Sequence, residues 1–360
     1  MCMKGQNGIS PCWICNIKGV HFGSCTNHVP LQWDKTPEAI PCQYFSFNLP
    51  ICTHEGLMIQ ACNIDMVPNN TTHEWLAKEH GIKNIPVLSS ISSISFPSSF
   101  PFNFMHLIWE NLIPNLIEFW TGKFKDLDYE GEGYFIEPHI WNDIGSATAA
   151  CRATIPSAFG ALVPDIATKW SQMSAEMYAN WTLYIAPIVL CGRFKSVQYY
   201  QHFMQLVELL KLCLAFTILE AMLNQLTRVS SCGWRNMESE PSFFLSCINH
   251  SNWYRLYYKY NPTWLSACSL TIHAPLHIAW SIRVAGPVWT YWAYPMEWHC
   301  NTLLQSIKSR RHPHMSISSF VTATAQLNQI WLLYDLHEAL CLDPDKKKST
   351  KLVHDLCKSC

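Results

Sequence analysis

The sequence has few charged residues, no long run of strongly apolar residues and no recognisable export signal. Charged side chains make up 14% of the 360 residues, and the formal net charge is −1. No overall field therefore attracts nucleic acid, and any contact with DNA has to come from a local basic patch. Apolar residues make up 49% of the chain, which is enough for a sizeable core and excludes extensive disorder away from the chain ends.

The sequence also lacks the marks of a membrane or secreted protein. Its best candidate for a membrane span, Met177–Gly192, contains Pro187 and is shorter than the roughly 18–20 residues that a spanning helix needs. No apolar region of the secretory type lies near the N-terminus. The 17 cysteines are odd in number and scattered, unlike a disulfide framework. We therefore expect a nuclear or cytoplasmic protein with mostly reduced, buried cysteines, neither secreted nor held in a membrane.

Arginine is scarce for a chain of this length. The sequence contains eight arginines against 16 tryptophans, 17 cysteines and 16 histidines. Selection for a stable, soluble surface favours the opposite balance, because arginine is mostly exposed whereas cysteine and tryptophan are mostly covered. The composition therefore needs a cause other than folding.

Three regions differ in their patterns, and together they predict a mainly α fold. Residues 1–60 are rich in Cys, Gly, Pro and His and show little periodicity, which suggests a small unit that needs a constraint such as a metal. We expect residues 1–100 to form a small irregular α+β segment with a Ser/Pro-rich linker at its end. Residues 101–340 are dominated by helical patterns, and residues 341–360 form a basic, flexible tail. Predicted helices cover residues 73–80, 104–120, 171–190, 199–226, 253–260, 271–283 and 295–309.

A metal-ligand pattern lies near the N-terminus. Cys12 and Cys15 are separated by two residues, which allows both thiolates to bind one tetrahedral zinc ion. Cys25 and His28 are placed to complete the site, with His21 as the alternative histidine, although the spacing is shorter than in common zinc fingers. We favour a structural zinc site over a turn with incidental cysteines.

A polar stripe lies on the otherwise apolar helix predicted over residues 104–120. Asn103, His106 and Glu110 fall within about a 60° arc of one helix face. Such a stripe can supply a carboxylate to a metal site with a histidine beside it. The pattern by itself favours the simpler interpretation, a solvated polar edge on a core helix.

A short basic cluster follows the helix predicted over residues 295–309. Lys308, Arg310 and Arg311 can contact the phosphates of a nucleic acid. They can equally complement the negative end of the helix. The sequence leaves both interpretations open.

Several long strings occur together and in a fixed order. They are KGQNGISPCWICNIKG at 4–19, HVPL at 28–31, LSSISSISFPSSFPFNFMHLIWENLIPNLIEFWTGKFKDLD at 88–128, TIPSAFGALVPDIAT at 154–168, and LSACSLTIHAPLHIAWSIRVAGPVWTYWAYPMEWHCNTLLQSIKSRRHP at 265–313. In these strings the chain resembles the transposases of fungal (basidiomycete) CACTA elements, also called En/Spm-like, over most of the sequence from residue 4 to about residue 335. The last string is long and specific, which makes a chance match an unsatisfactory explanation.

The resemblance implies a ribonuclease-H-like catalytic domain that uses three acidic residues. These acids hold two Mg²⁺ or Mn²⁺ ions, which activate water for DNA strand cleavage and a 3′-hydroxyl for strand joining. The Cys12–Cys15 segment lies after the first two acids in the family, so this chain lacks them. The third is expected near His106, where Glu110 is retained but Asn103 stands in place of the usual Asp. An amide binds Mg²⁺ more weakly than a carboxylate, and we expect no productive binding here.

Other departures from the family point the same way. Trp13 and Trp298 stand where the family usually has Arg, and Trp280 stands where it has Asp. Single C-to-T or G-to-A transitions convert Arg to Trp, Cys, His or Gln and Asp to Asn, which suggests a decaying transposon copy. We expect a truncated, degenerate transposase-like protein that is inactive alone, with transposon-end DNA or an intact transposase copy as partners. The alternative is a recruited, non-catalytic DNA- or protein-binding scaffold, and the oligomeric state is not predicted.

Overall fold

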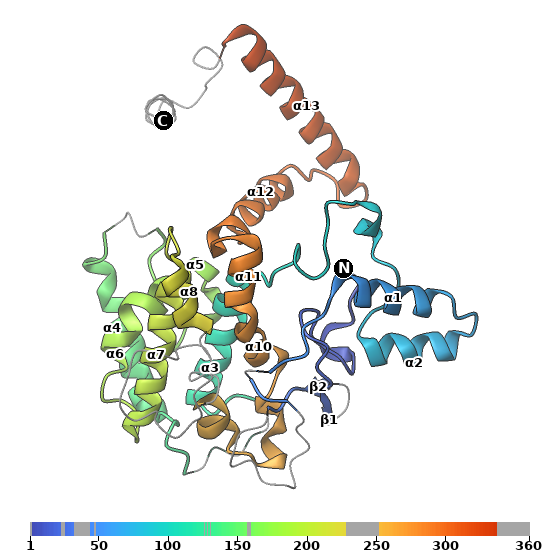
Figure 1. The fold of residues 1–360 in the computed structure, drawn as a ribbon. Coiled ribbons are helices and arrows are strands. Elements are labelled where there is room, and N and C mark those ends of the chain that lie inside the picture. The colour runs from blue at the N-terminus through green and yellow to red at the C-terminus, as the bar shows by residue number, and fades with distance from the viewer. Residues whose placement is uncertain are drawn as a thin grey trace. The chain divides into compact units, whose positions relative to one another are not determined.

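The structure is a computed structural model that describes residues 2–22, 26–31, 44–46, 48–125, 127, 129, 131–156, 160–227 and 252–336. The fold is mainly helical, as predicted (Figure 1). In these ranges the one sheet is a hairpin in which β1 (Val20–Phe22) pairs antiparallel with β2 (Thr26–His28), with Val20 opposite His28. None of the described helices combines the length and the apolar character that crossing a bilayer requires.

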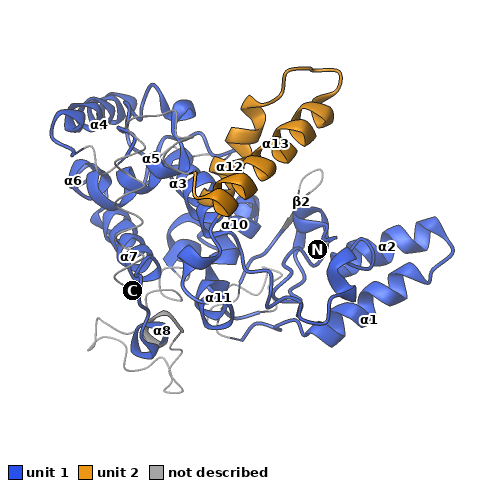
Figure 2. Ribbon diagram, turned by 90° about the horizontal axis from the view of Figure 1, so that it is seen from above, with its two compact units in different colours: residues 1–292 blue, residues 293–360 orange. Residues whose placement is uncertain are grey.

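The chain divides into two compact units, residues 1–292 and residues 293–360 (Figure 2). The linker expected to end the first region near residue 100 lies inside unit 1. Residues from both sides of that position share the interior of unit 1, as the hydrogen bond from the Trp13 indole to the Phe100 carbonyl and the contact between the Trp13 and Phe102 rings illustrate.

The N-terminal part of unit 1 contains two adjacent helices, α1 (His54–Asp65) and α2 (Asn70–His80). Each begins at a side-chain cap: the Thr53 hydroxyl accepts a hydrogen bond from the Gly56 amide, and the Asn69 side chain accepts one from the Thr71 amide. Helix α2 ends at Gly81, as predicted for the helix over residues 73–80. The small core beneath these helices consists of Leu57, Ala61, Ile64, Ala77, Ile82 and Phe96.

The larger core of unit 1 is built from the helices that follow. Residues Met105–Leu112 form a π-helical segment that continues into α3 (Ile113–Trp120), which confirms the helix predicted over residues 104–120. Pro114 lies in the first turn of α3, within the helical stretch that begins at Met105, and has no amide to donate to the preceding turn. The remaining elements of this part are α4 (Pro138–Ala150), α5 (Ala175–Asn180), a π-helical turn (Trp181–Ile185), α6 (Ala186–Val189), α7 (Val197–Cys213) and α8 (Glu220–Thr227).

Aromatic side chains fill the centre of this core. The indole of Trp120 donates a 3.1 Å hydrogen bond to the Tyr257 hydroxyl, and Phe119 packs edge-on against Tyr257 and Trp253. Tyr257 belongs to a π-helical turn, Tyr254–Tyr258. Paired ring contacts of this kind contribute beyond the area they bury. The aromatic-rich composition is therefore used in packing.

A continuous helical rod lies near the end of unit 1, and the described part of unit 2 contains two helices. The rod comprises α10 (Leu270–His273), a 3₁₀ turn (Ala274–His277) and α11 (Ile278–Ala285), which matches the prediction for residues 271–283. Unit 2 contains α12 (Tyr294–Gln305) and α13 (Pro313–Tyr334). Short 3₁₀-helical segments occur at Gly5–Asn7, Val87–Ser90, Cys151–Ala153, Trp170–Gln172, Pro262–Ala267 and Val288–Thr290.

Candidate metal centre

The Cys12–Cys15 segment is held in place by backbone pairing with residues 50–52. The amide of Cys52 donates to the Ile14 carbonyl and the amide of Asn16 donates to the Pro50 carbonyl, both at 2.8 Å. Cys12 is 2% exposed and Cys15 is fully buried. The two bonds fix the turn so that both thiols point to one side.

Gly81 allows the same segment to approach α2 closely. Gly81 has φ of +71°, and a Cβ on this residue would lie 1.9 Å from the carbonyl oxygen of Ser10. The amide of Ile9 donates to the Lys78 carbonyl in the last turn of α2. Only glycine meets both demands, because it tolerates positive φ and has no side chain to displace the neighbouring backbone. Gly81, the residue that ends α2, therefore also allows the segment that carries Cys12 and Cys15 to lie against this helix.

Two histidines face the cysteines from the helical rod at the far end of unit 1. His273 ends α10, and His277 ends the 3₁₀ turn that follows. Pro275 lies between them and lacks the amide that would continue the α-helical ladder, which accounts for the tighter turn. Both histidines are buried, with exposures of 0% and 2%.

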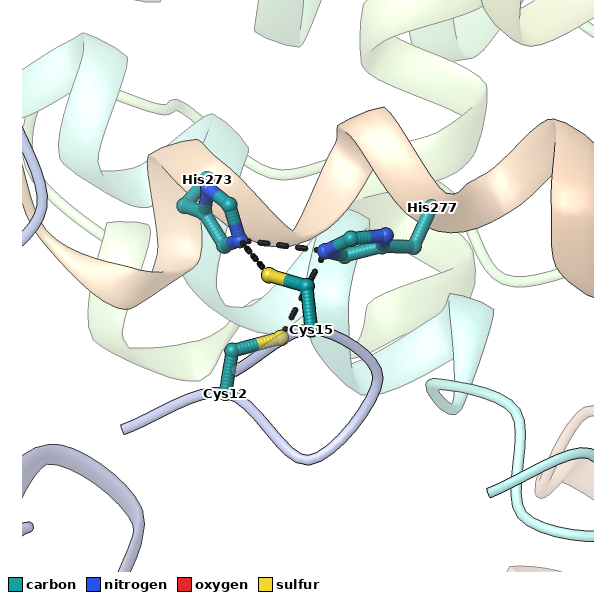
Figure 3. Close-up of side chains that lie close together, drawn as sticks. All are labelled: Cys12, Cys15, His273 and His277. Carbon is teal, nitrogen blue, oxygen red and sulfur yellow. Dashed lines mark hydrogen bonds between the residues drawn. The ribbon is translucent and has the colours of Figure 1, made fainter. Parts of the chain in front are cut away.

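The four side chains converge on one point (Figure 3). The Cys15 sulfur lies 3.1 Å from Nε2 of His273, and the Cys12 sulfur lies 3.4 Å from Nε2 of His277. The two Nε2 atoms are 3.0 Å apart. All four donor atoms lie within 4.8 Å of one another, and this is the one such group of His, Cys, Asp and Glu found in the described part of the chain.

The donor set fits a tetrahedral ion. Zinc bond lengths of about 2.3 Å to sulfur and 2.0–2.1 Å to nitrogen place neighbouring donors roughly 3.3–3.8 Å apart. The observed sulfur–nitrogen and nitrogen–nitrogen distances of 3.0–3.4 Å require shifts of only about 0.5 Å or less. The cluster could therefore hold a metal such as zinc, and its four protein donors would fill every position of a tetrahedral site.

The protonation of the cluster suits metal binding. Burial raises the pKa of Cys12, but hydrogen bonding to Cys15 and the adjacent His277 and His273 outweigh it and hold that pKa well below the usual value. Burial and the neighbouring Cys12 raise the pKa of Cys15. Burial lowers the pKa of His273, which favours the neutral imidazole that a metal needs. A divalent cation supplies the charge that lets both thiols ionise.

Aromatic side chains cover one side of the cluster. Phe102 stacks on the ring of His277 with centroids 6.2 Å apart, and Trp13 packs on Phe102 at 3.9 Å. The indole of Trp13 donates a 2.9 Å hydrogen bond to the Phe100 carbonyl. Trp13 is therefore packed and hydrogen-bonded here. This shell restricts the access of water to the metal ligands.

The predicted ligands are only partly those that the fold brings together. Cys12 and Cys15 do share a cluster, but His28 is not part of it, and the prediction for Cys25 lies outside the described residues. His28 is buried in β2, where burial, with Lys125 and His21 nearby, lowers its pKa to about 4. His21 is exposed. His28 instead lies in the β1–β2 hairpin. The two remaining donors, His273 and His277, come from the helical rod.

His106 and Glu110 lie in the π-helical segment and Asn103 lies just before it, away from any cluster of three metal-binding groups in the described ranges. Nε2 of His106 is 3.6 Å from the Glu110 carboxylate, with both side chains about two-fifths exposed. The side-chain oxygen of Asn103 accepts a hydrogen bond from the His106 amide. This arrangement matches a solvated polar edge, the simpler of the two sequence interpretations.

The basic cluster lies between α12 and α13 in unit 2. Lys308, Arg310 and Arg311 are all exposed, beyond the last turn of α12. Among the described residues none of the three forms an ion pair, which leaves their charges available to a phosphate. Their place beyond the helix end weakens the alternative role of complementing the helix dipole, because that effect is limited to the last turn.

His273 and His277 were not among the ligands expected from the sequence. A spacing of four residues within a predicted helix places two histidines on one face, which is a recognised metal-binding arrangement. That signal is weak in a chain with 16 histidines. It becomes specific only when a Cys-x-x-Cys pair is known to lie opposite.

No family model, no curated protein and no solved structure matches the chain. The interpretation of the site therefore rests on its own geometry.

Proposed function

We propose that Cys12, Cys15, His273 and His277 bind one zinc ion with a structural role, within a transposase-like protein that does not cut DNA by itself. The observation that carries the zinc proposal is the convergence of four buried thiol and imidazole donors on one point. Thiolate and imidazole are preferred by zinc, and four protein donors leave no position for water or substrate. Such a site stabilises a fold rather than performing a reaction.

The non-catalytic part of the proposal is supported by the surroundings of Glu110. Strand cleavage by two metal ions requires several carboxylates around one position. Glu110 has His106 as its partner at 3.6 Å, and the neighbouring Asn103 offers only a neutral oxygen. Among the described residues no group of three metal-binding side chains includes Glu110, and an intact transposase copy is the partner that we propose as the source of further carboxylates.

The DNA-binding part of the proposal rests on Lys308, Arg310 and Arg311. Their exposure and lack of described acidic partners suit contact with the phosphate backbone of transposon ends in the nucleus. A recruited scaffold that binds protein instead remains the second candidate, because the chain as a whole carries no net positive charge.

Cobalt substitution tests the zinc proposal directly. Purified protein is expected to contain one zinc per chain, and less than about half an equivalent would count against the site. Replacement by Co²⁺ is expected to give tetrahedral spectra with sulfur-to-cobalt charge-transfer absorption. Cys15→Ser should lower that absorption by about half, since one of two thiolate ligands is lost. Cys52→Ser is the matched control, because Cys52 adjoins the site but is not one of its four donors.

A gel-shift titration with transposon-end DNA tests the nucleic-acid proposal. If Lys308, Arg310 and Arg311 each contact a phosphate, replacing all three by Ala should make the slope of log K against the logarithm of salt concentration shallower by about three. The matched control replaces Lys211 and Arg283, which are engaged in ion pairs with glutamates. The absence of any shift at low salt would favour the scaffold, and equal loss in the control would show that no specific patch is used.

A further inference from the structure

Zinc binding at the four-residue cluster would fix where the protons of its two histidine rings lie. Nε2 of His273 faces the Cys15 sulfur and Nε2 of His277 faces the Cys12 sulfur, so both Nε2 atoms are placed to bind the ion. A neutral imidazole that binds a metal through Nε2 carries its one proton on Nδ1. The proposed site therefore makes Nδ1 of each histidine a hydrogen-bond donor.

The Nδ1 atom of His273 has no acceptor within the described part of the chain. The His273 side chain is fully buried, and its Nδ1 has no hydrogen-bond partner. Figure 3 shows this side of the ring turned away from both cysteines. A histidine that binds a metal almost always donates its other ring proton to an acceptor, which holds the ring in place. An acceptor for Nδ1 is therefore to be sought on the side away from the cysteines.

Ser269 offers an unused acceptor close in sequence. Its hydroxyl oxygen is also buried and without a partner. Ser269 is the N-cap of α10, a position at which a serine hydroxyl usually accepts a hydrogen bond from a backbone amide. No such side-chain bond is made here, and the amide of Ile272 donates to the Ser269 carbonyl instead. The hydroxyl is therefore not used by the helix that it precedes.

Helix α10 brings these two unpartnered groups to one face. The amide of His273 donates to the Ser269 carbonyl at 3.2 Å, which closes one helical turn between the two residues. Residues four positions apart lie one above the other on a helix, and the later side chain leans toward the earlier one. The ring of His273 therefore extends over the turn that begins at Ser269.

We propose that Ser269 is a positioning residue of the metal site, whose hydroxyl oxygen accepts the Nδ1 proton of His273 when zinc binds. The inference rests on the proposed zinc site and deepens it. The pairing needs only a rotation of the Ser269 side chain, because a serine hydroxyl moves among three staggered positions. It holds Nε2 toward the ion and satisfies a buried N–H that would otherwise oppose metal binding.

Competition for Zn²⁺ with a chromophoric chelator measures this contribution in the full chain. Ser269→Ala should weaken zinc binding about 10- to 100-fold, as expected when a metal-binding histidine loses its hydrogen-bond partner. Ser269→Thr keeps a hydroxyl suited to an N-cap and should bind zinc within about threefold of the wild type. Ser266→Ala is the matched control, because its hydroxyl is also buried and unpartnered but belongs to the preceding Pro262–Ala267 segment.

The ring proton gives a second readout that a merely structural role would not move. In zinc-loaded protein labelled with ¹⁵N-histidine, a hydrogen-bonded Nδ1 proton exchanges slowly with water and gives an NMR signal. Ser269→Ala should lose one such signal, and Ser269→Thr should keep it. In the presence of a strong chelator, Ser269→Ala and the wild type should unfold at the same urea concentration.

The outcomes separate this inference from the zinc proposal beneath it. Zinc bound as tightly by Ser269→Ala as by the wild type would leave the metal site standing and overturn the role of Ser269. Equal weakening by Ser266→Ala, or a lower urea midpoint for metal-free Ser269→Ala, would assign the effect to packing and also overturn it. Less than about half an equivalent of zinc in the wild-type protein would refute the zinc site itself.

Discussion

Metal removal is expected to cost unit 1 a large part of its stability, because the proposed ion joins distant parts of the chain. An ion that links Cys15 to His273 closes a loop of 258 residues. In the chain-entropy treatment of cross-links, a loop of that length contributes about 5–6 kcal/mol. Net stabilities of folded proteins are about 5–15 kcal/mol. The metal-free unit is therefore expected to be marginally stable.

The same treatment distinguishes the observed donor set from the local set expected from sequence. Cys12 and His28 are 16 positions apart, and a site confined to such a loop would contribute only about 3 kcal/mol. Residual zinc binding by Cys12 and Cys15 in the unfolded chain would reduce either value, since only preferential binding to the folded state stabilises it. The difference in stabilisation between the two donor sets should remain, because both sets contain Cys12 and Cys15 and are reduced equally.

Urea unfolding followed by tryptophan fluorescence provides the assay, under reducing conditions with zinc or with a strong chelator. With a slope of roughly 3 kcal/mol per molar urea, chelation should lower the midpoint by about 1.5–2 M. His277→Ala should unfold at the chelated midpoint whether or not zinc is added. Cys25→Ala and Cys52→Ala should keep the full response to the chelator.

Two outcomes would refute this reasoning. A chelator-induced change smaller than about 1 kcal/mol would mean that no long loop is closed by metal. A response abolished by Cys25→Ala but retained by His277→Ala would place the metal within the N-terminal segment.

Two further predictions concern residues outside the metal cluster. The pKa of His28 is lowered from 6.5 to about 4. Its contribution to stability is therefore fully present above pH 6.5 and falls by roughly 2 kcal/mol between pH 6.5 and 5, because the unfolded chain takes up a proton that the folded chain does not. His28→Gln should remove this part of the pH dependence in urea unfolding, whereas His139→Gln, at an exposed position, should not. Gly81→Ala should destabilise unit 1 by about 1–3 kcal/mol more than Gly131→Ala, because both residues have positive φ but only at Gly81 would an added Cβ meet neighbouring backbone. Equal urea midpoints for the two variants would contradict the close approach of Gly81 to Ser10.

Local patterns predicted the helices well where a cap or a sustained period was present. The helix before Gly81 and the segment over residues 104–120 are confirmed, because both signals depend on neighbours within one or two turns. The helix predicted over residues 199–226 is interrupted between α7 and α8. Helix α13 was not predicted, since its Ser- and Thr-rich sequence has no charged face and a weak helical propensity.

The metal centre shows the limit of sequence more sharply. The Cys-x-x-Cys pair was identifiable, because two thiolates two residues apart can bind one ion through local geometry alone. The string that carries the transposase resemblance contains His273 and His277, but their four-residue spacing is only a weak signal in a chain with 16 histidines.

Sequence alone thus determined the mainly helical class, the first two donors and the expectation of a metal. The tertiary structure decided which residues complete the site. Packing of the helical rod against the N-terminal turn brings His273 within 3.1 Å of Cys15 across 258 positions of sequence. The physical reason is that coordination depends on distance in space, whereas periodicity and spacing report only on residues a few turns apart.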